Sequence, residues 1–131
     1  MADILSLAEA WLAILPEGRF EDFPGEVSPD FVLRLPFVPP GIPSAFKGRA
    51  AAQAALQGSA RSRSPLVFTD KVMRRTDDPE LVVTTARAEA TMANGRTYRN
   101  EYVMFTRIRG CTVLEHVEYL NPLALIEAAG A

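Results

Sequence analysis

The fold is decided between residues 96 and 122, which read RTYRNEYVMFTRIRGCTVLEHVEYLNP. Asn94-Gly95, just before this stretch, is the strongest short hairpin signal, so we expect a strand over 81–93 to turn there into a second strand over 96–109. A further turn leads into a third strand over 111–120. Three consecutive strands joined by tight turns predict an antiparallel meander. Because these strands are longer than the usual five or six residues, they indicate a sheet that curves around something.

The remaining elements place helices ahead of this sheet. Apolar residues at helical spacing, alanine-rich runs and Pro or Gly breaks mark their limits. We expect helices over 3–15, 18–23, 48–57 and 123–129, strands over 31–35 and 66–75, and an ordered Pro- and Gly-rich loop over 37–47. Helices grouped ahead of a meander predict an α+β fold, a single domain over 1–131 in which helices cover one face of a curved antiparallel sheet.

Composition narrows the class of partner. The chain has 131 residues, a net charge of −2 and no run of Lys or Arg. Because binding to nucleic acids or anionic membranes requires a positively charged surface, we expect neither as a partner. One cysteine excludes an internal disulfide. We find no secretory pattern and no long apolar run, so we expect a cytoplasmic protein. No phosphate-binding loop or Cys/His cluster is present, so we expect neither a cofactor nor a metal.

Alternation along the strands predicts which side chains face the helices, since residues two apart share a face. We expect the face that lines a cavity to carry alternate residues of each strand, and to mix apolar groups with a few ionisable ones, as small-molecule sites do. From these strands we assign Thr85, Arg87, Glu89, Asn100, Tyr102, Met104, His116, Glu118 and Leu120 to the cavity, with Trp11 and Phe46 adding to its wall. The predicted ligand is a small hydrophobic organic molecule.

Glu118 is the strongest chemical candidate. A carboxyl buried among apolar and aromatic side chains would be desolvated, as general acid–base catalysis requires. His116 lies two residues away on the same face and could exchange a proton with it. Arg87 and Glu89 form an Arg-x-acid pair that could orient a substrate or a water. In the alternative, these polar groups only satisfy one another, and the protein is a non-catalytic ligand-binding or dimerisation module.

The opposite face of the sheet predicts an interface. We expect alternate residues over 82–92 and over 97–105 to point outward. Met92, Val103 and Phe105 make that surface partly apolar, which is typical of a homodimer that pairs through its sheets.

Three motifs carry a resemblance. Residues 31–41 read FVLRLPFVPPG, residues 46–49 read FKGR, and the last strand ends on EYLNPL at residues 118–123. With the order of elements, they resemble the SnoaL-like branch of the nuclear transport factor 2-like superfamily. That resemblance implies a cone, in which a curved, mostly antiparallel sheet wraps helices around a deep pocket and dimerises through its outer face. Relatives include ketosteroid isomerases, polyketide cyclases, epoxide hydrolases and binding modules.

Two branches of this superfamily suggest roles for named residues. In the pattern of limonene epoxide hydrolases, an Arg-x-Asp pair falls on Arg87 and Glu89 and a late Asp on Glu118, groups that there activate a water and protonate the epoxide. In phenazine-biosynthesis proteins, a Glu at the position of Glu118 acts as an acid on the substrate. The resemblance therefore implies cofactor-free acid–base chemistry of isomerase, cyclase or hydrolase type, with Glu118 as acid or base.

Overall fold

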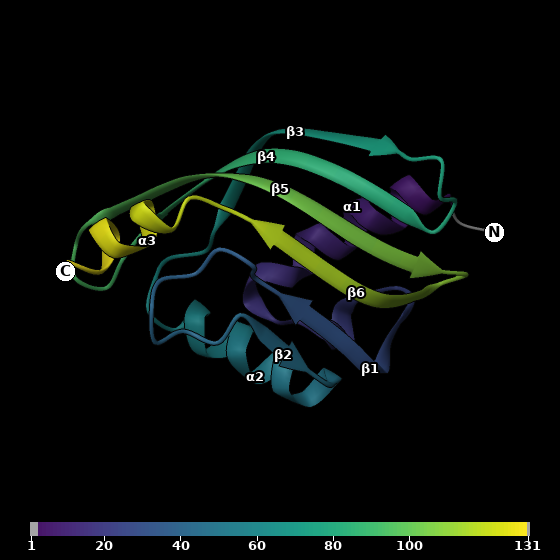
Figure 1. The fold of residues 1–131 in the computed structure, drawn as a ribbon, viewed down its shortest axis with the longest axis horizontal. Coiled ribbons are helices and arrows are strands. Elements are labelled where there is room, and N and C mark those ends of the chain that lie inside the picture. Colours follow the sequence, from purple (N-terminus) through teal and green to yellow (C-terminus); the bar gives the residue numbers. More distant parts are fainter. Residues whose placement is uncertain (1–2, 131) are drawn as a thin grey trace.

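The computed structural model describes residues 3–130 and shows a curved sheet wrapped over helices (Figure 1). Its elements follow the predicted order, except that a short strand, β2, lies at the end of the predicted loop over 37–47. They are α1 Ile4–Ile14, the 3-10 turns η1 Leu15–Glu17 and η2 Phe20–Asp22, β1 Glu26–Arg34, β2 Ala45–Lys47, α2 Arg49–Ala60, β3 Val67–Arg75, β4 Leu81–Thr91, β5 Thr97–Arg109, β6 Thr112–Tyr119 and α3 Pro122–Ala129. Within 3–130, none of the helices has the length and hydropathy needed to cross a bilayer. The predicted α+β class is confirmed.

The six strands lie in the order β2-β1-β6-β5-β4-β3. Strands β3 to β6 form the predicted antiparallel meander. Strand β1 pairs with β6 in parallel, so the sheet is mixed and not wholly antiparallel as expected. Strands β3 to β5 of the meander separate β1 from β6 in the sequence, and the chain passes through α2 before it enters β3 (Figure 1). The short β2 closes the edge beyond β1.

Strand β1 begins earlier than predicted, because a bulge replaces the expected turn at residues 28–30. Val27 pairs with Val113 and Val32 pairs with Glu115, so four residues of β1 lie opposite a single residue of β6. Pro29 falls inside this irregularity, where a residue without an N–H costs no ladder hydrogen bond. Helix α2 packs against β1.

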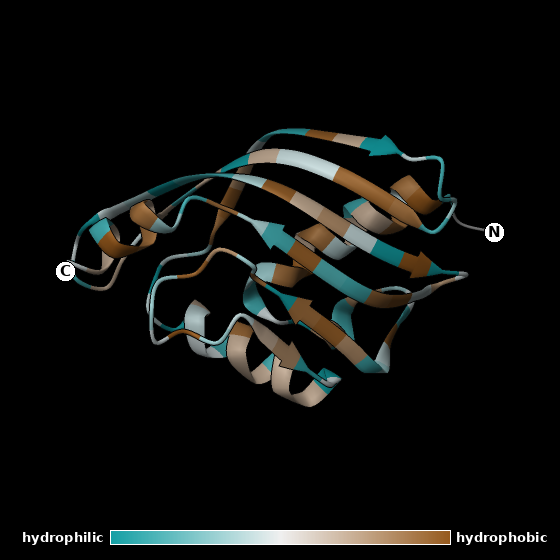
Figure 2. Ribbon diagram, in the orientation of Figure 1, coloured by the Kyte–Doolittle hydropathy of each residue, from teal (hydrophilic) through white to brown (hydrophobic). Residues whose placement is uncertain are grey.

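An aromatic cluster holds α1 against the inner face of the sheet. Trp11 has no exposed surface, and its ring lies 5.3 to 5.5 Å from those of Phe20, Phe23 and Phe31. These separations are typical of favourable edge-on and tilted aromatic packing. Brown, apolar segments of α1 accordingly lie behind the strands in Figure 2. The core therefore sits between α1 and the sheet.

Strand β4 turns the opposite face inward from the one predicted. The buried row is Val82, Thr84, Ala86, Ala88 and Ala90, and the outward row carries Thr85, Arg87, Glu89 and Thr91. The cause is the hairpin loop, which has three residues and not two. The N–H of Met92 donates to the carbonyl of Arg96, Gly95 adopts φ +87°, and Thr91 pairs with Thr97. One extra loop residue shifts the register by one and exchanges the two faces of a strand.

This register places small residues opposite large ones. On the inner face, Ala90 lies opposite Tyr98, Ala88 opposite Asn100 and Ala86 opposite Tyr102. The absent side-chain volume on β4 leaves room for the phenol rings of β5. Strand β5 and the end of β6 face as predicted. A second bulge, between Arg107 and Ile108, displaces Leu114 and gives its expected inward place to the fully buried Val113.

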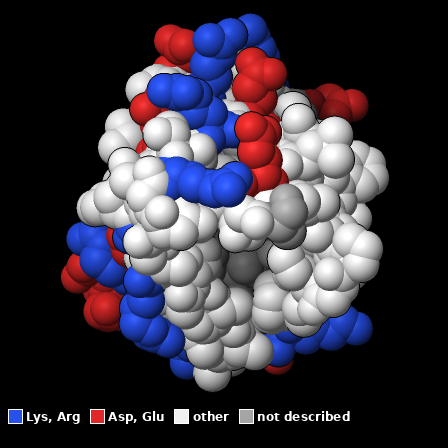
Figure 3. All heavy atoms as spheres, turned by 90° about the vertical axis from the view of Figure 1, so that its left-hand side faces the viewer, with Lys and Arg blue, Asp and Glu red and all other residues white. Residues whose placement is uncertain are grey.

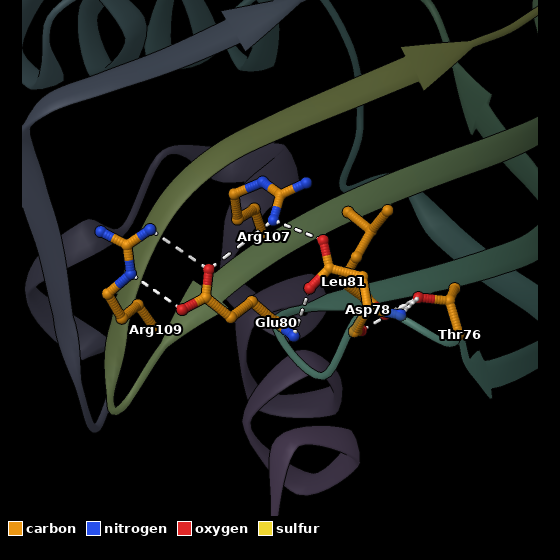
Figure 4. A network of polar contacts seen from close by, with 6 residues as sticks. All are labelled: Thr76, Asp78, Glu80, Leu81, Arg107 and Arg109. Carbon is orange, nitrogen blue, oxygen red and sulfur yellow. Dashed lines mark hydrogen bonds and ion pairs between the residues drawn. The ribbon is translucent and has the colours of Figure 1, made fainter.

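A polar network joins the β3–β4 turn to the end of β5 (Figure 4). Arg107 donates to Asp78 at 2.9 Å, and Arg109 donates to both carboxylate oxygens of Glu80, at 2.8 and 3.2 Å. The Thr76 hydroxyl lies 3.0 Å from the carbonyls of Asp78 and of Leu81 and closes the turn. These contacts keep the far end of the meander together, remote from the cavity described below.

The assignment of faces on β4 can be tested by a matched pair of substitutions. Ala86→Leu forces three extra carbons against Tyr102 and should destabilise the protein by about 1–3 kcal/mol. Thr85→Leu adds a similar side chain on the outward face and should change the free energy of unfolding by less than about 0.5 kcal/mol. Urea denaturation measures both. A larger loss for Thr85→Leu than for Ala86→Leu would restore the face predicted from the sequence.

Acid should weaken the polar network. The backbone N–H of Glu80 and the guanidinium of Arg107 lower the pKa of Asp78, and Arg109 lowers the pKa of Glu80. A carboxyl whose pKa is lower in the folded state stabilises the fold above its unfolded pKa, near pH 4, and that contribution is lost as pH falls through the folded pKa. Stability should therefore decline below about pH 4, and less so in an Asp78→Asn/Glu80→Gln double variant. Equal acid sensitivity of both proteins would contradict this assignment.

Candidate functional site

A cavity of about 310 Å³ opens between the inner face of the sheet, α2, α3 and the loop before β2. Its size is at the lower end of the range for small-molecule sites. Most of the wall is apolar, and includes Leu33, Leu35, Phe46, Leu56, Phe68 and Leu120. Four ionisable side chains also reach it: Arg63, Tyr98, Tyr102 and Glu118. Figure 3 shows a hollow at this end of the molecule, bordered mostly by residues without charge.

Glu118 is the carboxylate of this wall. It lies near the end of β6, its side chain is 12 % exposed, and its Oε1 lies 3.2 Å from Nε2 of the fully buried His116. The two residues point the same way because they are two apart on one strand. Oε2 has no hydrogen-bonding partner within residues 3–130, so one carboxylate oxygen is free to meet a ligand.

His116 is held in one tautomer. The indole Nε1 of Trp11 lies 3.2 Å from Nδ1 of His116, and the hydroxyl of Thr106 lies 3.0 Å from the same nitrogen. An indole N–H can only donate, so Nδ1 must accept and carries no proton. The neutral imidazole therefore has its proton on Nε2, which donates to Glu118. The contact is a hydrogen bond from a neutral imidazole to a carboxylate, and no charge on the histidine is needed to form it.

Two phenols on β5 line the wall beside Glu118. The hydroxyls of Tyr98 and Tyr102 are 2.6 Å apart, and the side-chain amide of Asn100 donates to Tyr98 at 2.8 Å. Asn100 also holds the start of α3, because its amide donates to the carbonyl of Asn121 and its oxygen accepts the N–H of the same residue. Asn100 thus links the phenol pair to the start of α3.

Burial keeps both phenols protonated. It raises the pKa of Tyr98 and raises that of Tyr102 well above the usual value, and the negative charge of Glu118 acts in the same direction on both. A protonated phenol is a hydrogen-bond donor. One of the two phenol protons is used in the hydrogen bond between Tyr98 and Tyr102, so the arrangement can offer one carboxylate and one phenol donor to the same apolar ligand.

The structure brings together part of the predicted site. Phe46, Tyr102, Glu118 and Leu120 line the cavity. His116 lies behind Glu118 with no exposed surface. The remaining inward residues do not reach the cavity wall: Trp11 and Met104 are fully buried in the core, and Asn100 holds Tyr98 and Asn121. Their expected contact with a ligand is therefore corrected to a supporting place behind it.

Three predicted residues lie on the wrong side of the sheet. Thr85, Arg87 and Glu89 point outward because of the β4 register. Arg87 pairs with Glu101 at 3.3 Å and Glu89 pairs with Arg99 at 3.1 Å, in side chains that are all more than half exposed. They border a broad groove of about 970 Å³ on the outer face. The Arg-x-acid arrangement of an epoxide hydrolase is therefore not assembled around Glu118, and that alternative is wrong for these residues.

Arg63 is the site residue that the sequence did not reveal. It lies in the connector between α2 and β3, which has no periodicity. Its carboxylate partner, Glu17, is 46 residues away, so no local spacing links the two. Within the described part of the chain, no three His, Cys, Asp or Glu side chains converge as they would around a metal ion.

Comparisons with known proteins agree with this architecture. Residues 8–116 match the family described as the SnoaL-like domain. An uncharacterized PhzA/B-like protein of Pseudomonas aeruginosa is 28 % identical over 121 residues, which cover 91 % of this chain and 84 % of the relative.

Two crystal structures show how widely the fold is shared. A candidate isomerase from Bacillus subtilis superposes with a TM-score of 0.85 at 22 % identity, covering 99 % of this chain and 96 % of its own. The BvnE pinacolase of Penicillium brevicompactum superposes with a TM-score of 0.79 at 15 % identity, covering 98 % and 92 %. At these identities the likeness concerns the fold. The match over most of its length shows that the chain belongs to the SnoaL-like domain family.

Proposed function

We propose that the protein binds a small, mostly apolar organic molecule in this cavity and catalyses a cofactor-free proton transfer on it. The observation that carries the proposal is Glu118, which presents a largely buried carboxylate to an apolar cavity and holds one oxygen free. The names of the pinacolase and of the candidate isomerase are consistent with rearrangement chemistry on this fold.

In the proposed reaction, Oε2 of Glu118 takes a proton from a carbon or hydroxyl of the ligand and returns it at another position. His116 donates through Nε2 to Oε1 and so orients the carboxylate, which makes it a positioning residue and not the proton shuttle expected from the sequence. The phenol pair of Tyr98 and Tyr102 stabilises negative charge that develops on a ligand oxygen. Atoms are rearranged within the substrate, as in an isomerase or cyclase.

A non-catalytic binding module is the second candidate. It is favoured by the hydrogen bonds among Asn100, Tyr98 and Tyr102, which also anchor α3 and would serve a purely structural role. In that case Glu118 would only select ligands that carry a hydrogen-bond donor. The two candidates differ in whether a proton is exchanged between the ligand and water.

Deuterium exchange into a small aryl ketone separates these candidates. Phenylacetone in D₂O should exchange its α protons faster with the protein present, as followed by proton NMR. Glu118→Gln keeps the size and the hydrogen bond from His116 but removes the base, and should slow the catalysed exchange by about 100-fold or more. Glu115→Gln is the matched control, since Glu115 lies on the same strand and pairs with Arg34 on the outer face. Unchanged exchange by Glu118→Gln would rule out Glu118 as the base.

We also propose a homodimer through the outer face of the sheet. Val103 is 38 % exposed there, and the rings of Phe105 and Phe37 both pack edge-on against Tyr119. Met92, which we expected on this face, lines the cavity instead. The apolar part of the surface is therefore narrower than predicted, and the ion pairs between β4 and β5 border it on one side. Protein interfaces likewise combine an apolar centre with polar residues at the rim.

Sedimentation equilibrium at micromolar concentration should give twice the mass of one chain. Val103→Glu places a charge in the centre of the proposed interface and should shift the protein towards monomer. Ala54→Glu introduces the same charge on an exposed position of α2 and should leave the mass unchanged. A monomeric parent protein would refute the dimer.

A further inference from the structure

Arg63 is a buried cation in the mostly apolar wall of the cavity. Its side chain is only 8 % exposed, although it belongs to the connector between two elements. A bridge to Met92 fixes the connector against the end of β4. Taking a guanidinium out of water is costly unless its donors find partners. The partners of Arg63 therefore show what it can still bind.

Only part of the guanidinium is used inside the protein. Nη1 donates to the carboxylate of Glu17 at 3.2 Å and to the carbonyl of Ser64 at 3.2 Å, and Nη2 donates to the carbonyl of Pro16 at 2.8 Å. Arginine has five N–H groups. Nε–H and the second proton of Nη2 thus have no partner within residues 3–130.

The unused donors belong to atoms that suit a carboxylate. Nε and Nη2 lie on one edge of the planar group, and an arginine edge binds a carboxylate through two parallel hydrogen bonds. Glu17 does not block this edge, because its contacts are to Nη1 and to the backbone N–H of Leu66. The positive charge also acts across the cavity, since it partly offsets the rise in the pKa of Tyr98 and Tyr102.

We propose that Arg63 binds a carboxylate of the ligand, so that the substrate is a small organic acid with an apolar body. The inference rests on the proposed use of this cavity and adds the class of molecule that it takes. In the described wall, Arg63 is the single cation and Glu118 the single carboxylate. A phosphate dianion would bring two negative charges to a guanidinium that is already paired with Glu17. A monocarboxylate brings only one negative charge and can accept hydrogen bonds from the two unused donors.

In the proposed binding mode, one end of the ligand lies at Arg63 and the reacting end lies at Glu118. The carboxylate lies at Arg63, near the end of α2, and the apolar body packs on the leucine and phenylalanine side chains of the wall. The reacting position is then presented to Glu118 and the phenol pair on the sheet. Such anchoring at a distance from the chemistry fixes the orientation in which the proton is transferred.

Isothermal titration with octanoate and with 1-octanol, at about pH 7.5, tests this inference. The two probes share an alkyl chain and differ in the charged head. The parent protein should bind octanoate at least about ten-fold more tightly than octanol, the size of effect expected for hydrogen bonds between charged groups. Arg63→Met keeps an extended apolar stem and should remove this preference by weakening octanoate binding alone.

A second variant keeps the test open if Arg63→Met fails to fold. Glu17→Gln removes the charge that competes for Arg63, while its amide oxygen can still accept the N–H of Leu66. It should strengthen octanoate binding several-fold and leave octanol binding unchanged. Equal affinity of the parent protein for the two probes, or no response of octanoate binding to either substitution, would overturn the carboxylate site.

That outcome is distinct from failure of the proposed function. The role of Glu118 is judged by deuterium exchange into a neutral ketone, which carries no carboxylate. Exchange that depends on Glu118, together with no preference for octanoate, would leave the acid–base proposal standing and remove only the Arg63 site. Octanoate preference that depends on Arg63, without any exchange, would support the carboxylate site in a protein that binds and does not catalyse.

Discussion

The hydrogen bond from Trp11 to His116 is the constraint on which the candidate site depends. It joins α1 to β6 through two side chains that have no exposed surface, and it is enclosed by the aromatic cluster around Trp11. Because the indole can only donate, the imidazole has a single way to complete its hydrogen bonds, through Nε2 to Glu118. One core contact thereby sets the orientation of the carboxylate at the cavity wall.

The packing that fixes this carboxylate also explains why a cavity persists beside it. Protein interiors are normally close-packed, so an opening of about 310 Å³ sacrifices contacts that a filled core would make. Here the surrounding frame is stiff: Asn100 ties β5 to α3, and Arg63 ties the connector after α2 to η1. These contacts hold the elements around the cavity in place. A rigid apolar space with few polar groups is what a small ligand requires.

Much of this could be predicted from the sequence, because alternation on β5 and β6 reflects burial directly. Glu118, His116, Tyr102 and Leu120 were assigned to the inner face by parity alone, and the structure places them there. Strand β4 could not be assigned in the same way. Its two rows are both mixed, with alanines on one and charges on the other, so its face depends on the loop length at Asn94-Gly95, where one residue reverses the result.

The place of Arg63 in the cavity wall could not be predicted from the sequence for a different reason. Its burial arises from tertiary contacts with residues 16 and 17, which no local pattern encodes. The parallel pairing of β1 with β6 likewise joins segments that are far apart in the sequence. It could not be predicted because the bulge in β1 has the sequence pattern of a turn. Sequence periodicity thus revealed which residues of a regular strand share a face, but not which distant segments meet at the cavity.

The tautomer of His116 tests the central claim most directly. The chain contains one histidine, so long-range ¹H–¹⁵N correlation of its imidazole in the ¹⁵N-labelled protein has no overlap from others. For the neutral ring, the account predicts a protonated Nε2 and a bare Nδ1, and predicts that Trp11→Phe disturbs this pattern by removing the donor to Nδ1. A proton on Nδ1 in the parent protein would contradict the account, because the indole of Trp11 could then not donate to His116 and Glu118 would lose the hydrogen bond that orients it.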